Sequence, residues 1–159
     1  MTLKPGDPAP DFSMPASGGR TVGLAALRGR PFVLYFYPKA DTPGCTKEAC
    51  AFQEALPQFG AADITVIGVS KDKMPPIEKF AEKYGLRFPL ASDAATQVAE
   101  AYGVWGEKSM YGRKYMCMLR TTFLVDAAGR IARIWPNVKV SGHAAEVMKA
   151  VAALPARAE

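Results

Sequence analysis

Residues 32–50 of this chain read FVLYFYPKADTPGCTKEAC. The first six, Phe32 to Tyr37, form an unbroken apolar and aromatic run rich in β-forming types, which is typical of a strand buried on both faces of a parallel sheet. The turn signal Pro43-Gly44 then leads into a segment whose apolar residues, from Ala49 to Phe59, recur at helical spacing. This stretch therefore predicts a central strand that passes through a short loop directly into a helix.

Strand-like and helix-like patterns alternate on both sides of this unit. In chain order, we further expect a small hairpin at residues 12–14 and 20–23, a strand at 64–69, a helix between Asp72 and Gly85, a strand at 88–91, a helix at 94–102, a hairpin at 120–126 and 130–135, and a final helix after Ser141. Asp72 and Ser141 are expected to cap their helices. Strands and helices that alternate and end in a hairpin indicate an α/β fold of the thioredoxin-like type, with a central mixed sheet flanked by helices and an N-terminal β-hairpin extension.

Length and charge limit the classes of protein that the chain can belong to. Its 159 residues predict a single domain over residues 1–159, because domains usually hold roughly 100–200 residues. The net charge is only +5 and no stretch concentrates it, so we expect no nucleic-acid partner. The longest apolar run has six residues, against the ~20 that a membrane span requires, and no apolar leader is visible near Met1. We expect a cytoplasmic protein with no membrane contact.

Cys45 is the residue in this stretch that can carry chemistry. It falls in the first turn of the predicted helix, beyond the end of a central strand, which is where open α/β sheets bind their ligands. Unpaired N–H groups and the helix dipole favour a thiolate over a thiol at such a position. The position alone leaves open whether Cys45 is a nucleophile or a buried structural cysteine.

Cys50 follows on the same predicted helix. Five helical residues place two Cα atoms roughly 8.7 Å apart, whereas a disulfide needs about 7 Å or less. The two thiols therefore cannot bond while the helix is intact, but they can if its first turns unwind. A pair that is close but unbonded suits a catalytic cycle better than a structural disulfide.

Several motifs now match a known family. The pattern Pro38-x-x-x-Thr42-x-x-Cys45 resembles the active-site signature of peroxiredoxins, and Phe36 to Thr46 together with Cys50 is similar to their bacterioferritin comigratory protein (PrxQ) branch. Glu48 stands three residues after the first cysteine, as in that branch. Downstream, the run from Arg120 to Asp126 resembles the strand that supplies the family's active-site arginine. The likeness extends over most of the chain.

The resemblance implies a thioredoxin-dependent peroxidase with four catalytic residues. Cys45 is implied as the peroxidatic cysteine, which attacks hydrogen peroxide or an organic hydroperoxide and becomes a sulfenic acid. Thr42 and Arg120 are implied as groups that stabilise the charge developing in this step. Cys50 is implied as the resolving cysteine, which forms an intramolecular disulfide with Cys45.

The resemblance also implies supporting residues and partners. Pro38 is expected to shield the sulfur from water, and Glu48 to orient Arg120 through a bidentate pair. Thioredoxin or a similar dithiol is the expected reductant. No cofactor or metal is expected. Because resolution within one chain needs no second subunit, we expect a monomer.

Other features leave alternatives open. Cys117 stands where the family resemblance leads us to expect glycine, so it is a second candidate for resolving Cys45. The chain could also be a thioredoxin-like redox relay or holdase without peroxidase turnover, while a Cys-x-x-Cys oxidoreductase is disfavoured by the four residues between Cys45 and Cys50. His143 is interpreted as a capping or surface residue, and Trp105 and Tyr111 as residues that pack a loop.

Overall fold

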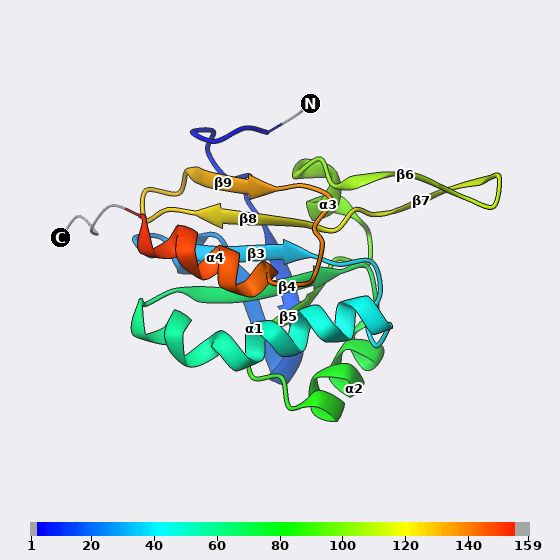
Figure 1. Ribbon diagram of the computed structural model, residues 1–159, viewed down its shortest axis with the longest axis horizontal. Helices are drawn as coiled ribbons and strands as arrows, with labels where there is room; N and C mark the ends of the chain where they lie inside the picture. The colour runs from blue at the N-terminus through cyan, green and yellow to red at the C-terminus, as the bar shows by residue number, and fades with distance from the viewer. Residues whose placement is uncertain (1–2, 155–159) are drawn as a thin grey trace.

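The computed structural model describes residues 3–154, and its main feature is a seven-stranded mixed sheet with helices on both faces (Figure 1). The strand order along the sheet is β2-β1-β5-β4-β3-β8-β9. These strands are β1 (Ser13–Ala16), β2 (Arg20–Gly23), β3 (Phe32–Phe36), β4 (Thr65–Ser70), β5 (Leu90–Ser92), β8 (Thr121–Val125) and β9 (Ile131–Trp135). β3 pairs with β4 in parallel and with β8 in antiparallel orientation. The predicted mixed sheet and its N-terminal hairpin, β1 with β2, are confirmed.

Two hydrophobic cores lie on opposite faces of the sheet. The helices are α1 (Pro43–Ala61), α2 (Met74–Tyr84), α3 (Gln97–Ala101) and α4 (His143–Ala152), with short 3-10 turns η1 (Ser17–Gly19) and η2 (Ala25–Leu27). α1, α2 and α4 contribute to one core, and α3 contributes to the other. Along β3, Val33 and Tyr35 enter the first core while Leu34 and Phe36 enter the second. Burial on both faces is why this strand is an unbroken apolar run.

Gly68 in the middle of β4 is required by close packing. A Cβ atom at this position would lie 2.8 Å from the Tyr35 ring and hydroxyl and 2.8 Å from Leu90. We therefore expect Gly68→Ala to destabilise the protein by about 1–3 kcal/mol, the usual effect of overpacking a core. Urea unfolding measures the change. Gly60→Ala is the matched control, because a Cβ on this α1 residue meets nothing within 4 Å. Equal stabilities of the two variants would contradict the expectation.

The two predicted helix caps are wrong. The residue that precedes α2 is Lys73 and the one that precedes α4 is Gly142, and neither makes a side-chain capping hydrogen bond. Asp72 instead uses its carboxylate to hold the loop before α1, as described below. Pro75 and Pro76 lie in the first turn of α2, and the helix ends at Gly85, which has the left-handed conformation.

The segment from Trp105 to Met118 forms a hairpin that the sequence did not predict. β6 (Trp105–Met110) pairs with β7 (Arg113–Met118) as a separate two-stranded sheet. The interpretation of Tyr111 as a loop-packing residue is wrong, since its side chain is 98% exposed. Most of the described hairpin residues are exposed on both faces. The sequence therefore lacks the alternation of apolar and polar residues that marks a strand with one buried face.

Candidate active site

The loop between β3 and α1 is held in place by two aspartates. The backbone N–H of Ala40 donates to Asp72 Oδ2 at 2.7 Å, and the Ser70 hydroxyl donates to the same oxygen at 2.8 Å. On the outer side, Asp41 accepts hydrogen bonds from Lys83 Nζ at 3.0 Å and from the Tyr84 hydroxyl at 2.9 Å. The end of β4 and the helix α2 therefore fix the path of the chain into α1.

Cys45 lies in the first turn of α1 and is buried. Just before it, Gly44 leaves room for an arginine, because a Cβ there would lie 3.2 Å from Arg120 Nη2. Arg120 stands directly before β8, and its carbonyl accepts a hydrogen bond from Val138 N at 2.9 Å. Since β8 pairs with β3, the sheet brings Arg120 to the edge from which α1 begins.

The Arg120 guanidinium joins Cys45 to Glu48. Its Nη2 donates to Cys45 Sγ at 3.2 Å, and its Nη1 donates to Glu48 Oε1 at 2.7 Å. The expected bidentate pair between Glu48 and Arg120 is therefore not formed, because the second nitrogen of the fork faces the sulfur. Glu48 Oε1 still holds the guanidinium through Nη1. The site therefore places a cation and the start of a helix at the same sulfur.

Glu48 is a buried carboxylate with an incomplete set of partners. Its side chain is 1% exposed, and its Oε2 has no hydrogen-bond partner within residues 3–154. Desolvation raises the pKa of Glu48 to about 7, although Arg120 acts in the opposite direction. The carboxyl group therefore changes its protonation state near neutral pH, beside the guanidinium that contacts Cys45.

Thr42 and Pro38 lie in the same loop. Thr42 is the N-cap residue of α1, and its hydroxyl donates to the Lys39 carbonyl at 2.8 Å rather than to the helix. The Thr42 hydroxyl must leave this carbonyl before it can donate to a bound molecule. Pro38 is half-buried beside the loop. The loop before α1, the helix α1 itself and the start of β8 thus supply the four residues Thr42, Cys45, Glu48 and Arg120.

The three cysteines are all free thiols. Cys50 is half-buried on α1, and its pKa is raised by burial and by the nearby Glu54. The backbone bond from Thr46 N to Thr42 O, at 2.8 Å, shows that the first turn of the helix is formed in this state. Cys117 is buried on β7 opposite Gly106. The cysteine pair on α1 is therefore in the unbonded arrangement that the spacing predicts.

Three buried polar residues near the site were misread or missed in the sequence. His143 is buried, and its Nε2 lies 2.8 Å from the Thr122 hydroxyl, so the interpretation as a cap or surface residue is wrong. Burial lowers the pKa of His143 to about 4. Tyr35 and Tyr37 are also buried, and the Tyr35 hydroxyl has no hydrogen-bond partner among residues 3–154. Tyr35 lies on β3 and Tyr37 directly follows the strand, so the spacing of two residues places both rings on the face covered by α1.

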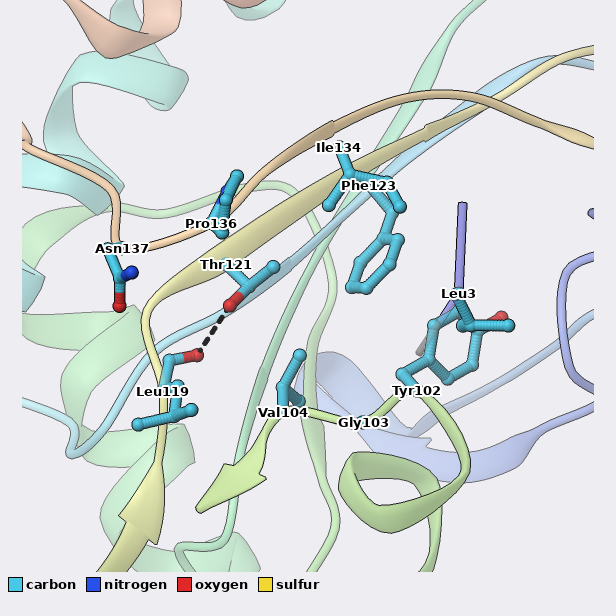
Figure 2. Close-up of a pocket in the computed structure, with 10 residues that line it drawn as sticks. All are labelled: Leu3, Tyr102, Gly103, Val104, Leu119, Thr121, Phe123, Ile134, Pro136 and Asn137. Atoms are coloured by element: carbon cyan, nitrogen blue, oxygen red, sulfur yellow. Dashed lines mark hydrogen bonds between the residues drawn. The ribbon is translucent and has the colours of Figure 1, made fainter. Parts of the chain in front are cut away.

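A cavity of about 180 Å³ lies beside Arg120 but does not include the cysteines. Figure 2 shows Leu119, Thr121 and Phe123 along its wall, with the Thr121 hydroxyl bonded to the Leu119 carbonyl. Leu119 and Thr121 flank Arg120 in the chain. Because side chains alternate along a strand, the cavity lies on the face of β8 opposite to Cys45. It is therefore separate from the candidate active site.

Among residues 3–154, no group of three histidine, cysteine or acidic side chains is placed to hold a metal ion. None of the helices in the same range has the length and apolar character needed to cross a membrane.

A cysteine in the first turn of a helix lies beside the end of a central strand of a mixed sheet and accepts a hydrogen bond from an arginine. This arrangement is typical of a thiol-dependent oxidoreductase of thioredoxin-like fold. The AhpC/TSA family model matches residues 5–134, and the chain belongs to this family. Within it, the chain is a peroxiredoxin of the Bcp/PrxQ type, as the sequence resemblance predicts. Peroxiredoxins are thiol peroxidases.

Similar proteins and solved structures support the assignment to the Bcp/PrxQ type. A putative Bcp peroxiredoxin from Coxiella burnetii is 47% identical over 93% of this chain and 98% of its own length. Peroxiredoxin Bcp from Bacillus subtilis is 44% identical over 94% and 95%. Peroxiredoxin Q from Xanthomonas campestris superimposes with a TM-score of 0.85 at 40% identity, covering 89% of this chain and 90% of that one. A PrxQ mutant from Xylella fastidiosa gives a TM-score of 0.91 at 36% identity, covering 96% and 98%.

Proposed function

We propose that this chain reduces hydrogen peroxide and organic hydroperoxides, with Cys45 as the peroxidatic and Cys50 as the resolving cysteine. The observation that carries the proposal is the bond of 3.2 Å from Arg120 Nη2 to Cys45 Sγ. It supports a thiolate held at a helix start by a fixed cation. The bacterioferritin comigratory protein of Xanthomonas campestris has alkyl peroxide reduction activity, which supports including organic hydroperoxides among the substrates.

The proposed first step oxidises the sulfur of Cys45. The thiolate attacks one peroxide oxygen, the O–O bond breaks, and Cys45 becomes a sulfenic acid while an alkoxide or hydroxide leaves and takes up a proton. Arg120 stabilises the negative charge as it moves from sulfur to oxygen. Thr42 turns its hydroxyl from Lys39 to the peroxide, and Pro38 shields the sulfur from water.

The proposed second step needs the start of α1 to unwind. The Cys50 thiolate then attacks the sulfenic sulfur, the S–O bond breaks as the disulfide forms, and the hydroxide that leaves takes up a proton to become water. The first turn is the part of a helix that opens at least cost, which supports this route. Thioredoxin or a similar dithiol then supplies two electrons and restores both thiols. Resolution within one chain supports a monomer, and the need for reduced thiols supports a cytoplasmic location.

Mapping the oxidised cysteines tests the proposed pairing. One equivalent of hydrogen peroxide, added without oxygen, is expected to give a disulfide between Cys45 and Cys50 and to leave Cys117 free. Peptide mass spectrometry identifies the bond. Cys50→Ser is expected to keep the first oxidation of Cys45 but to stall turnover with thioredoxin, whereas the control Cys117→Ser turns over normally. A disulfide between Cys45 and Cys117, or full turnover of Cys50→Ser, would contradict the assignment of Cys50.

A further inference from the structure

The β6–β7 hairpin projects from the molecule as an arm of residues 105–118 (Figure 1). From Glu107 to Met116, every side chain that the structure describes is exposed, on both strands. Six-residue strands give the arm a length of about 20 Å. A two-stranded hairpin in water is at best marginally stable by itself. Such an arm gains stability when a partner covers it.

The arm begins beside the candidate active site. At its base, Lys71 Nζ lies 5.4 Å from the centre of the Trp105 ring, which ties β6 to the residue that follows β4. At its other base, β7 ends two residues before Arg120, the residue that contacts Cys45. Figure 1 shows the arm extending on the same side of the molecule as the start of α1. A partner that lies along the arm as far as its base would therefore lie near Arg120 and Cys45.

The tip of the arm carries an aromatic residue in an unfavourable conformation. Tyr111 has a φ of 52° and the following Gly112 has a φ of 76°. A two-residue turn with both φ angles positive favours Asn-Gly, and a bulky side chain in the left-handed region is an outlier. The Tyr111 ring is 98% exposed, so no packing within the described chain offsets this cost. Backbone strain at an exposed aromatic residue points to a role outside the fold.

The arm is also basic. It carries Lys108, Arg113 and Lys114 but only one acidic residue, Glu107. Glu107 lies 3.7 Å from Lys114, which leaves Lys108 and Arg113 without an acidic partner among residues 3–154. The arm thus presents cations and an aromatic tip, a composition that suits a partner surface with acidic side chains.

We propose that the β6–β7 arm docks the protein dithiol that reduces the oxidised chain, through acidic side chains near that partner's reactive cysteine. This rests on the proposed function above. The partner's thiolate attacks one sulfur of the Cys45–Cys50 disulfide and releases the other as a thiolate. The partner's second thiol then breaks the mixed disulfide, so two electrons pass to this chain and the partner leaves oxidised. Redox encounters of this kind bury little surface, so a short arm suffices.

Turnover with two reductants tests the proposal. The probes are a bacterial thioredoxin recycled by its reductase, and dithiothreitol, which is too small to need a docking surface. For Lys108→Glu/Arg113→Glu, the kcat/KM for thioredoxin relative to the rate constant for dithiothreitol is expected to fall about tenfold at low salt, the scale of electrostatic steering. Tyr111→Asn, which favours the turn, is expected to lower the same ratio without unfolding the arm.

Arg28→Glu/Lys149→Glu is the matched control. It makes the same change in charge at exposed positions outside the arm, and is expected to leave the ratio unchanged. Added salt should lower the ratio for the wild type but not for the arm variant. An unchanged ratio in the arm variants, or an equal fall in the control, overturns the proposal. So does a change of oligomeric mass without a change in the ratio, which would assign the arm to a second copy of this chain. Failure of the proposed function is distinguishable, because the wild type would then consume no peroxide even with dithiothreitol.

Discussion

Arg120→Met is expected to lower the rate constant for oxidation of Cys45 by hydrogen peroxide by about 10²–10³-fold, the usual effect of removing one donor that stabilises a developing oxyanion. Methionine nearly matches the length of the arginine side chain but has no charge and no N–H group. The donor lost lies 3.2 Å from the sulfur in the reduced state. Single-turnover oxidation with rapid quenching and mass spectrometry of Cys45 measures the rate constant without involving any reductant.

Two further variants separate the charge of Arg120 from its structural role. Arg120→Lys keeps the positive charge but has a single ammonium, which cannot reproduce the planar fork that reaches Glu48 and Cys45 together. Its rate constant is expected to lie between those of the wild type and Arg120→Met. Arg120→Met/Glu48→Gln removes the buried carboxylate that the single change leaves unpaired, so its stability recovers while its rate constant stays low. A rate constant for Arg120→Met within threefold of the wild type would remove Arg120 from the chemistry.

The sequence predicts the part of the site that depends on local pattern. An unbroken apolar strand that leads through Pro43-Gly44 into a helix places Cys45 in a first turn, and the structure agrees. The contact between Arg120 and Cys45 spans 75 residues, and no local pattern indicates it. The family resemblance alone picked out Arg120. Pairing of β8 with β3 is what brings these two residues together.

The errors at Asp72 and His143 share a physical cause, which is tertiary contact that local sequence does not record. Asp72 is of a residue type that often caps helices and stands just before α2, but its carboxylate accepts a hydrogen bond from Ala40 N in another loop. The sequence places His143 at the start of α4, where an exposed side chain is expected. In the structure α4 packs against α1, and the His143 ring contacts the Phe52 ring in a T-shaped arrangement. The β6–β7 arm was missed for the opposite reason, since most of its described side chains are exposed and impose no apolar pattern.

Burial shifts the pKa values of two groups near the site, Glu48 and His143. Their contributions to stability therefore change in opposite directions as pH changes. The pKa of Glu48 is about 7, above its ordinary value of 4.5, so between these values the folded chain binds more protons than the unfolded chain. Stability from this group is therefore full below pH 4.5 and is lost as pH rises to 7. The pKa of His143 is about 4, below its ordinary value of 6.5. Stability from this group is full above pH 6.5 and is lost as pH falls to 4.

Each shift corresponds to about 3 kcal/mol, at about 1.4 kcal/mol per pKa unit. In the window from pH 4.5 to 6.5, the slopes of the two contributions have opposite sign and nearly cancel. Glu48→Gln removes the contribution that falls with pH, so its stability relative to the wild type is expected to rise by about 3 kcal/mol between pH 4.5 and 7. His143→Gln is expected to show the reverse, with its relative stability rising by about 3 kcal/mol as pH falls from 6.5 to 4.

Urea unfolding of the wild type, both single variants and the double variant across pH 4 to 7.5 measures these differences. All other titrating groups are common to the four proteins, so they cancel when the curves are subtracted. The double variant should follow the wild type across the central window, because it lacks both opposing slopes. Four parallel curves would show that neither group titrates differently in the folded chain. If the relative stability rises with pH for Glu48→Gln but stays constant for His143→Gln, a group other than His143 supplies the opposing slope. Opposing slopes would allow this site to keep a carboxyl group that titrates near neutral pH, beside its arginine, without making the stability of the fold fall as pH rises from 4.5 to 6.5.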